Sequence, residues 1–121
     1  MEIKTKPVAK ERPRKGKNGF YTPRKTKKFE ELIKSEYLKQ DGTYHEGEVT
    51  AFIEITKKYP ESWPKTKKVE SPCLTRPDLD NIAKSILDAL NGIAYKDDNQ
   101  VSTLIISKEY AAEDIIKVEL Y

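Results

Sequence analysis

The chain has one cysteine and one histidine in 121 residues, which excludes several classes of protein at once. A single cysteine cannot form an intramolecular disulfide, and this fits a reducing compartment. The usual zinc sites need several cysteine or histidine ligands, and the sequence has no such cluster. No glycine-rich phosphate loop occurs either, so we expect no nucleotide cofactor.

Long apolar runs are also missing. No segment has the length of a membrane span or the pattern of a signal peptide, so we expect a soluble, cytoplasmic protein without membrane contact. The length suits a single domain over residues 1–121 with one modest core. Apolar and charged residues each make up 36% of the chain, which predicts a thin core. A homodimer, which buries more apolar surface, is therefore expected.

The distribution of charge is uneven although the net charge is only +3. Residues 1–35 contain 12 Lys/Arg and 4 Asp/Glu (+8), whereas residues 36–121 contain 11 and 16 (−5). Phe20 and Tyr21 lie within the basic stretch of residues 10–28. Cations that neutralise phosphates and rings that stack on unpaired bases are typical of nucleic-acid binding. The alternative is a solvated loop whose two rings pack into the core. The candidate DNA contacts are Arg12, Arg14, Lys15, Lys17, Arg24 and Arg76.

Hydrophobic periodicity predicts the order β-α-β-α-β-β, which is a mixed α/β (α+β) fold with one sheet of about four strands and two helices. The expected strands cover residues 2–6, 48–59, 101–110 and 114–121. The first helix is expected to begin with Thr22 as N-cap and Pro23 as first helical residue, and to end near Lys39. The second begins at Asp78 and has Gly92 as C-cap.

Three local features carry further expectations. The nearly all-apolar strand at 101–110 predicts a central strand covered on both faces. Residues 111–113 are short enough for a hairpin turn. Residues 60–76 are rich in proline and lysine and show no hydrophobic period, so we expect a long loop there. We expect Trp63, within this loop, to pack on the edge of the core.

The main chemical signal is the occurrence of Asp78, Asp80, Asp97 and Asp98 in one 21-residue window. Asp78 and Asp80 open the second helix, and Asp97 and Asp98 follow the glycine that ends it. Mg²⁺ prefers a few carboxylate ligands and retains several waters. A metal held there could activate water to attack a phosphodiester, and a nearby lysine such as Lys84 could stabilise the developing charge.

Each acid also has an ordinary structural interpretation. An aspartate at a helix start is a common N-cap, and Asp97-Asp98-Asn99 could be a simple turn. Asp80 and Lys84, four residues apart, could form a surface ion pair. The only histidine, His45, is expected to be an exposed loop residue, and Cys73 is expected to be inert.

The sequence RPDLDNIAKSILDALNG (76–92), followed by KDDNQV (96–101), resembles the RusA family of Holliday-junction resolvases. The amino end is similar too, with KPV at 6–8, RPR at 12–14 and YTP at 21–23. The resemblance implies a homodimeric, Mg²⁺-dependent endodeoxyribonuclease of recombination and repair, with Mn²⁺ as a substitute metal, that makes paired nicks in four-way DNA junctions. By motif position it implies metal-binding catalytic aspartates at Asp78, Asp80 and Asp98, with Asp97 as the alternative, and an essential Lys84.

Two other functions remain open at this point. In one, the acids are caps and turns, and the chain is a non-catalytic basic DNA-binding module. In the other, a nuclease of the same fold acts on flaps or replication forks.

Overall fold

The centre of the sheet is β4 (Val49–Lys58), in which buried Ala51, Ile53 and Ile55 alternate with more exposed residues. The computed structural model describes residues 1–121. On one side β4 pairs antiparallel with β7 (Ile115–Leu120), and on the other it pairs parallel with β6 (Val101–Ala111). Short strands β1 (Glu2–Ile3) and β5 (Ser71–Pro72) complete the order β1-β7-β4-β6-β5.

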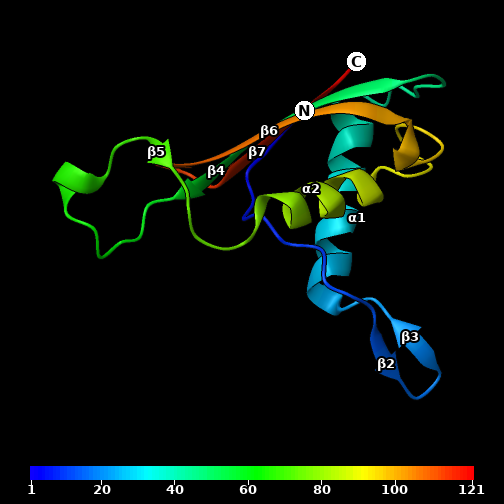
Figure 1. Ribbon diagram of the computed structural model, residues 1–121, viewed down its shortest axis with the longest axis horizontal. Helices are drawn as coiled ribbons and strands as arrows, with labels where there is room; N and C mark the ends of the chain where they lie inside the picture. The colour runs from blue at the N-terminus through cyan, green and yellow to red at the C-terminus, as the bar shows by residue number, and fades with distance from the viewer.

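Both long helices, α1 (Arg24–Gln40) and α2 (Leu79–Ala89), lie on one face of this sheet (Figure 1). Their apolar sides meet the sheet in one core, with Ile33, Ile53 and Ile86 almost completely buried. Two 3₁₀ turns, η1 (Lys65–Lys67) and η2 (Asp98–Gln100), lie in the connections. Strands β2 (Arg14–Gly16) and β3 (Gly19–Tyr21) form a separate hairpin. The mixed α+β class with two main helices is confirmed, with five strands in the main sheet.

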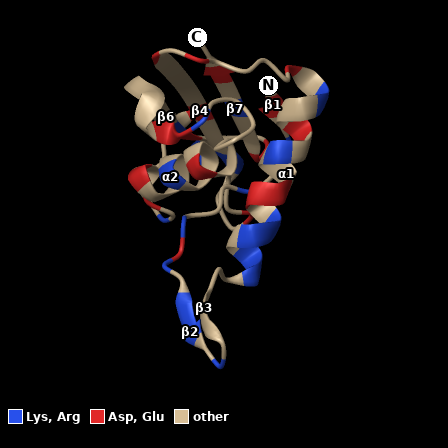
Figure 2. Cartoon of the chain, turned by 90° about the vertical axis from the view of Figure 1, so that its right-hand side faces the viewer, with Lys and Arg blue, Asp and Glu red and all other residues tan.

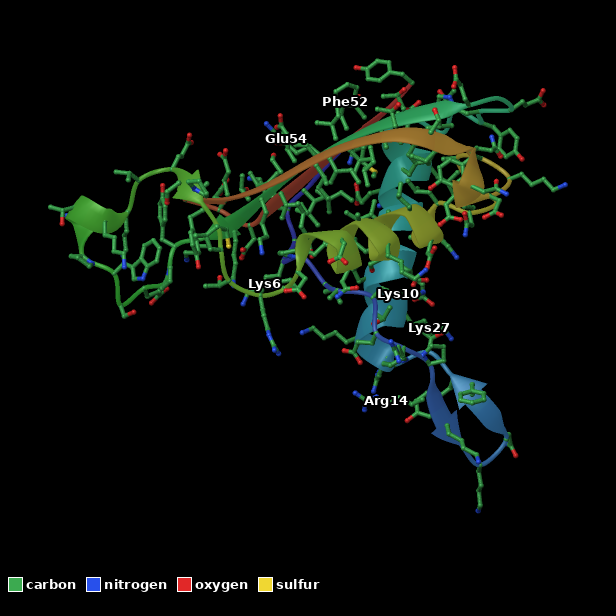
Figure 3. The ribbon with its side chains drawn as sticks, viewed as in Figure 1. Lys6, Lys10, Arg14, Lys27, Phe52 and Glu54 are labelled. Atoms are coloured by element: carbon green, nitrogen blue, oxygen red, sulfur yellow. The ribbon has the colours of Figure 1, made fainter.

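The prediction of a central, doubly covered strand at 101–110 is wrong. No helix covers the second face of the sheet, and β6 has β5 as its outer neighbour only at Tyr110 and Glu109. Ile105, which pairs with Phe52 on this face, is consequently 53% exposed, and Leu104, which pairs with buried Ala51 on the helix face, is 39% exposed at the open edge. Figure 3 shows Phe52 and Glu54 of β4 pointing away from the helices on this open face. The apolar run of β6 therefore reflects an uncovered surface and not a buried one.

The hairpin predicted at residues 111–113 is also wrong, because β4 lies between β6 and β7. The basic stretch before α1 contains the β2–β3 hairpin, although none of the expected strands lies there. Pro23, and not Thr22, occupies the N-cap of α1, and α2 reaches its C-cap at Leu90, two residues before Gly92. Trp63 packs as predicted, with its ring centroid 4.8 Å from that of Tyr110.

Gly92 connects α2 to the acidic turn with a φ of +77°, a left-handed conformation that other residues adopt at a cost. Replacing it with alanine is expected to lower the free energy of unfolding by about 1–2 kcal/mol in urea denaturation. Gly47→Ala is the matched control, because Gly47 has no positive φ and open space around its Cα. Equal stability of the two variants would contradict the importance of this turn.

Candidate active site

The first two acids of the predicted site lie free at the start of α2. Asp78 occupies the N-cap position, yet its side chain makes no capping hydrogen bond to the helix. Asp80 follows in the first turn. Both residues are exposed, and neither carboxylate has a hydrogen-bond or ion-pair partner within the chain. Helix capping therefore does not account for Asp78, and the Asp80–Lys84 ion pair is not formed.

Two lysines of the sheet hold the segment that leads to Asp78. Lys108 of β6 donates hydrogen bonds from Nζ to the carbonyl oxygens of Thr75 and of Pro77, the latter at 2.7 Å. Lys57 of β4 donates to the carbonyl of Arg76 at 2.8 Å. Ammonium groups that bind backbone oxygens fix the path of the chain, so the position of Asp78 is tied to the sheet.

Lys84 pairs with Asp88, an acid outside the set predicted from the sequence. Asp80, Lys84 and Asp88 are spaced by four residues and lie along one side of α2. Lys84 Nζ lies 3.7 Å from Asp88 Oδ2, and Lys10 Nζ approaches the same oxygen at 3.5 Å. Lys10 also pairs with Glu30 of α1. Burial lowers the pKa of Lys10, but these two acids outweigh it and the pKa is raised.

The two acids of the later turn have different surroundings. Asp97 forms a capping box on η2: its side chain accepts a hydrogen bond from a backbone N–H, and the Gln100 side chain accepts one from the Asp97 N–H. Asp98 has its backbone N–H bonded to Asn91 Oδ1 at 2.8 Å. Gln100 further donates to the carbonyls of His45 and Gly47, both at 2.9 Å. Asp97 is thus used in capping, whereas the Asp98 carboxylate has no such role.

The carboxyl group of Asp98 lies among other acids. Partial burial, together with the neighbouring carboxyls of Asp97 and Asp88, raises its pKa from the ordinary value of 3.8 to about 6. Crowding of this kind favours the neutral form, and a nearby cation would relieve it. The surroundings of Asp98 are therefore short of positive charge.

No three His, Cys, Asp or Glu side chains are gathered closely enough here to hold a metal ion. Asp98 lies beside Asp88, which is two helical turns, about 12 Å along the axis, from Asp80. The donors themselves suit a hard divalent cation: all are carboxylates, two have no partner, and the third is destabilised by its neighbours.

The predicted DNA contacts are all exposed. In Figure 2, Lys and Arg gather on β2 and the first turns of α1, while Asp and Glu recur along α2. Arg14 forms an ion pair with Glu11 at 3.2 Å. Arg76 precedes α2 and is distant in sequence from the other basic residues. It nevertheless lines a cavity of about 250 Å³ together with Lys25 and Glu11. Arg76, two residues before Asp78, is thus brought beside Lys25 of α1.

His45 was expected to be an exposed loop residue, but it is half-buried, and its Nε2 has no hydrogen-bond partner. Its backbone N–H donates to the carbonyl of Ala94 at 2.7 Å, so the histidine supports the turn before Asp98. Cys73 is a free, buried thiol whose Sγ lies 3.5 Å from Thr75 Oγ1.

Sequence reasoning missed several residues that position the site: Lys10, Lys57, Asp88, Asn91, Gln100 and Lys108. Asp88 offered a signal, because it continues the four-residue spacing of Asp80 and Lys84 on one side of the helix. Gln100 stands three residues after Asp97, the spacing of a capping box, and Asn91 is seven residues before Asp98. Lys10, Lys57 and Lys108 act across distances in sequence that no local pattern encodes.

Comparison with known proteins adds two findings. The family model described as endodeoxyribonuclease RusA matches residues 4–121. A curated relative, the uncharacterized protein YqaN of Bacillus subtilis (strain 168), is 34% identical over 126 residues, which cover 93% of this chain and 87% of the relative. Neither helix has the length and apolar character needed to cross a membrane.

Proposed function

We propose, from the premise that this chain belongs to the RusA family of endodeoxyribonucleases, that it resolves four-way DNA junctions by paired phosphodiester hydrolysis. The observation that carries the proposal is the pair of unpartnered carboxylates, Asp78 and Asp80, at a helix start beside a basic surface. Acids in this position that served only as caps would be hydrogen-bonded to the helix. A non-catalytic DNA-binding module has no use for them.

The residues divide into three roles. Asp78, Asp80 and Asp98 would hold Mg²⁺, or Mn²⁺ in its place, and the bound cation would supply Lewis-acid activation of water and phosphate. Lys84, which is 61% exposed and pairs with Asp88, would contact the scissile phosphate. Exposed basic residues from Arg12 to Arg24, with Arg76, bind flanking phosphates. The single free cysteine fits the reducing cytoplasm, where we expect recombination and repair to use this activity.

The test is cleavage of a synthetic four-way junction with the wild-type chain, in Mg²⁺ and in EDTA. We expect symmetric nicks near the branch point in Mg²⁺ and none in EDTA. Junction binding without any cleavage would favour the non-catalytic module. Forks, flaps and linear duplex of the same sequences belong in the panel, because faster cutting of a fork or flap would transfer the proposal to that substrate.

Paired nicks require two active sites, and the open side of β6 supports a homodimer. Residues 101–107 are uncharged, have no neighbouring strand on the outer side, and expose Leu104 and Ile105. An uncharged edge strand can pair antiparallel with its own copy across a two-fold axis without bringing like charges together. A second copy of the chain is therefore the partner that this edge suits best.

Ile105→Lys is expected to convert the dimer into a monomer in light-scattering measurements, because it places a charge at the edge of two paired strands. The control is Leu38→Lys, which changes an exposed residue of α1. A monomeric wild type, or a dimeric Ile105→Lys variant, would contradict this placement of the interface.

A further inference from the structure

The β2–β3 hairpin projects away from the sheet and the helices, beyond the start of α1 (Figures 1 and 2). It lies within residues 10–28, which contain nine Lys/Arg and one acid, Glu11. Its register places Lys15 opposite Phe20 and Arg14 opposite Tyr21. The hairpin is thus a basic arm, defined here as residues 14–21, that carries two aromatic rings.

The two rings of the arm differ in what they contact. In an antiparallel pair, opposed residues share a face and successive residues alternate. Tyr21 shares a face with Gly16, and a Cβ added at Gly16 would come within 3.0 Å of the Tyr21 ring. Tyr21 therefore packs across the hairpin. Phe20 lies on the other face beside Lys15 and is 75% exposed. Packing accounts for Tyr21 and leaves Phe20 without a role in the fold.

The arm is rooted at the candidate active site. The backbone N–H of Lys10 donates to the carbonyl of Asn81 in α2 at 2.9 Å, and its side chain pairs with Asp88. Figure 3 shows Lys10 beside the helices and Arg14 at the root of the hairpin. Five residues of extended chain span at most about 18 Å, so Lys15 and the opposed Phe20 lie no more than about five nucleotide steps from this anchor. A DNA strand bound at the site passes within reach of the ring.

We propose that Phe20 stacks on a base exposed at the branch point of the DNA, and so helps this chain to select branched substrates. The inference rests on the proposed junction substrate. Within a duplex every base is covered on both faces, whereas the branch point leaves base faces open. An exposed ring among cations is the arrangement that binds such bases, because the cations hold the adjacent phosphates and the ring covers the base. Arg14, Lys15 and Lys17 supply the cations.

The test compares Phe20→Ala with wild type in EDTA, so that no DNA is cut. Loss of one stacked base corresponds to roughly a tenfold loss of affinity for the junction, with affinity for linear duplex unchanged. Lys15→Ala is the matched control on the same face, and it should weaken junction and duplex equally and reduce the salt dependence of both. Phe20→Trp should restore junction binding. Equal losses on junction and duplex for Phe20→Ala would overturn the proposal.

A photocrosslink locates the contact directly. With 5-iododeoxyuridine at the branch point, irradiation should attach the DNA to the peptide that contains Phe20, and the same base placed in the middle of a duplex arm should give no such product. A branch-point crosslink elsewhere in the chain would overturn the proposal, as would conversion of the dimer to a monomer by Phe20→Ala. If wild type binds and crosslinks the junction but never cuts it, the nuclease function fails and the stacking stands. If wild type cuts it and Phe20→Ala binds equally well, only the stacking fails.

Discussion

Replacing Asp80 with asparagine should lower the rate of junction cleavage by about a hundredfold to a thousandfold, with junction affinity changed by less than about threefold. Asparagine has the same shape and removes one negative charge. Because the Asp80 carboxylate has no partner within the chain, the substitution breaks no hydrogen bond or ion pair of the fold. The loss should therefore appear in the rate of the chemical step, measured with enzyme in excess over DNA.

The control for this experiment is Glu46→Gln, which removes one negative charge from an exposed loop residue outside the acidic cluster. It should cleave at the wild-type rate. Cleavage by Asp80→Asn at a rate similar to that of Glu46→Gln would remove Asp80 from the active site.

Asp98→Asn should abolish cleavage to a similar extent and at the same time stabilise the metal-free protein. The carboxyl of Asp98 lies against those of Asp97 and Asp88, and its pKa of about 6 means that the ionised form is disfavoured in the fold. At neutral pH, which is above this pKa, Asp98 is ionised in the wild-type protein. The fold is therefore destabilised by the full cost of that charge. Asparagine removes it, so the free energy of unfolding in EDTA should rise by about 1 kcal/mol after allowance for solvent screening.

Mg²⁺ should reverse the order of stability. A cation bound only to the folded protein adds about 2.7 kcal/mol at a hundred times its dissociation constant, and this gain requires the Asp98 ligand. Thermal unfolding of both proteins with and without Mg²⁺ checks the prediction. The assignment of Asp98 fails if asparagine destabilises the metal-free protein, or if Mg²⁺ raises the melting temperatures of both proteins equally. Asp97→Asn keeps a side-chain oxygen that can cap η2, so it should retain the stabilisation by Mg²⁺ that Asp98→Asn loses.

Local pattern was enough to predict both helices, the alternating strand β4 and the position of the acids along the chain. The period of apolar residues directly reports which side of an element is buried, and Ile82 and Ile86, four residues apart in α2, are fully buried. The same rule failed for β6, because an apolar run indicates a surface to be covered and does not say whether the same chain covers it. Leu104 and Ile105 remain exposed for this reason.

The support of Asp78 could not be predicted because it depends on pairings distant in sequence. Lys108 reaches Thr75 and Pro77 only because β6 passes beside the segment before α2. Asp97 and Asp98 are adjacent and chemically identical, and only the hydrogen bonds of Gln100 and Asn91 give them different surroundings. Sequence identifies which acids are available, whereas the tertiary contacts decide which of them are free.

The most direct test of the divalent-cation site is a titration of Mn²⁺ followed by electron paramagnetic resonance of the free ion. We predict saturable binding to wild type, and a loss of at least about tenfold in affinity for Asp78→Asn, Asp80→Asn and Asp98→Asn alike, because each removes one of three ligands. Glu46→Gln should bind as wild type does. Wild-type affinity in all three aspartate variants would contradict the proposal that these carboxylates hold one cation.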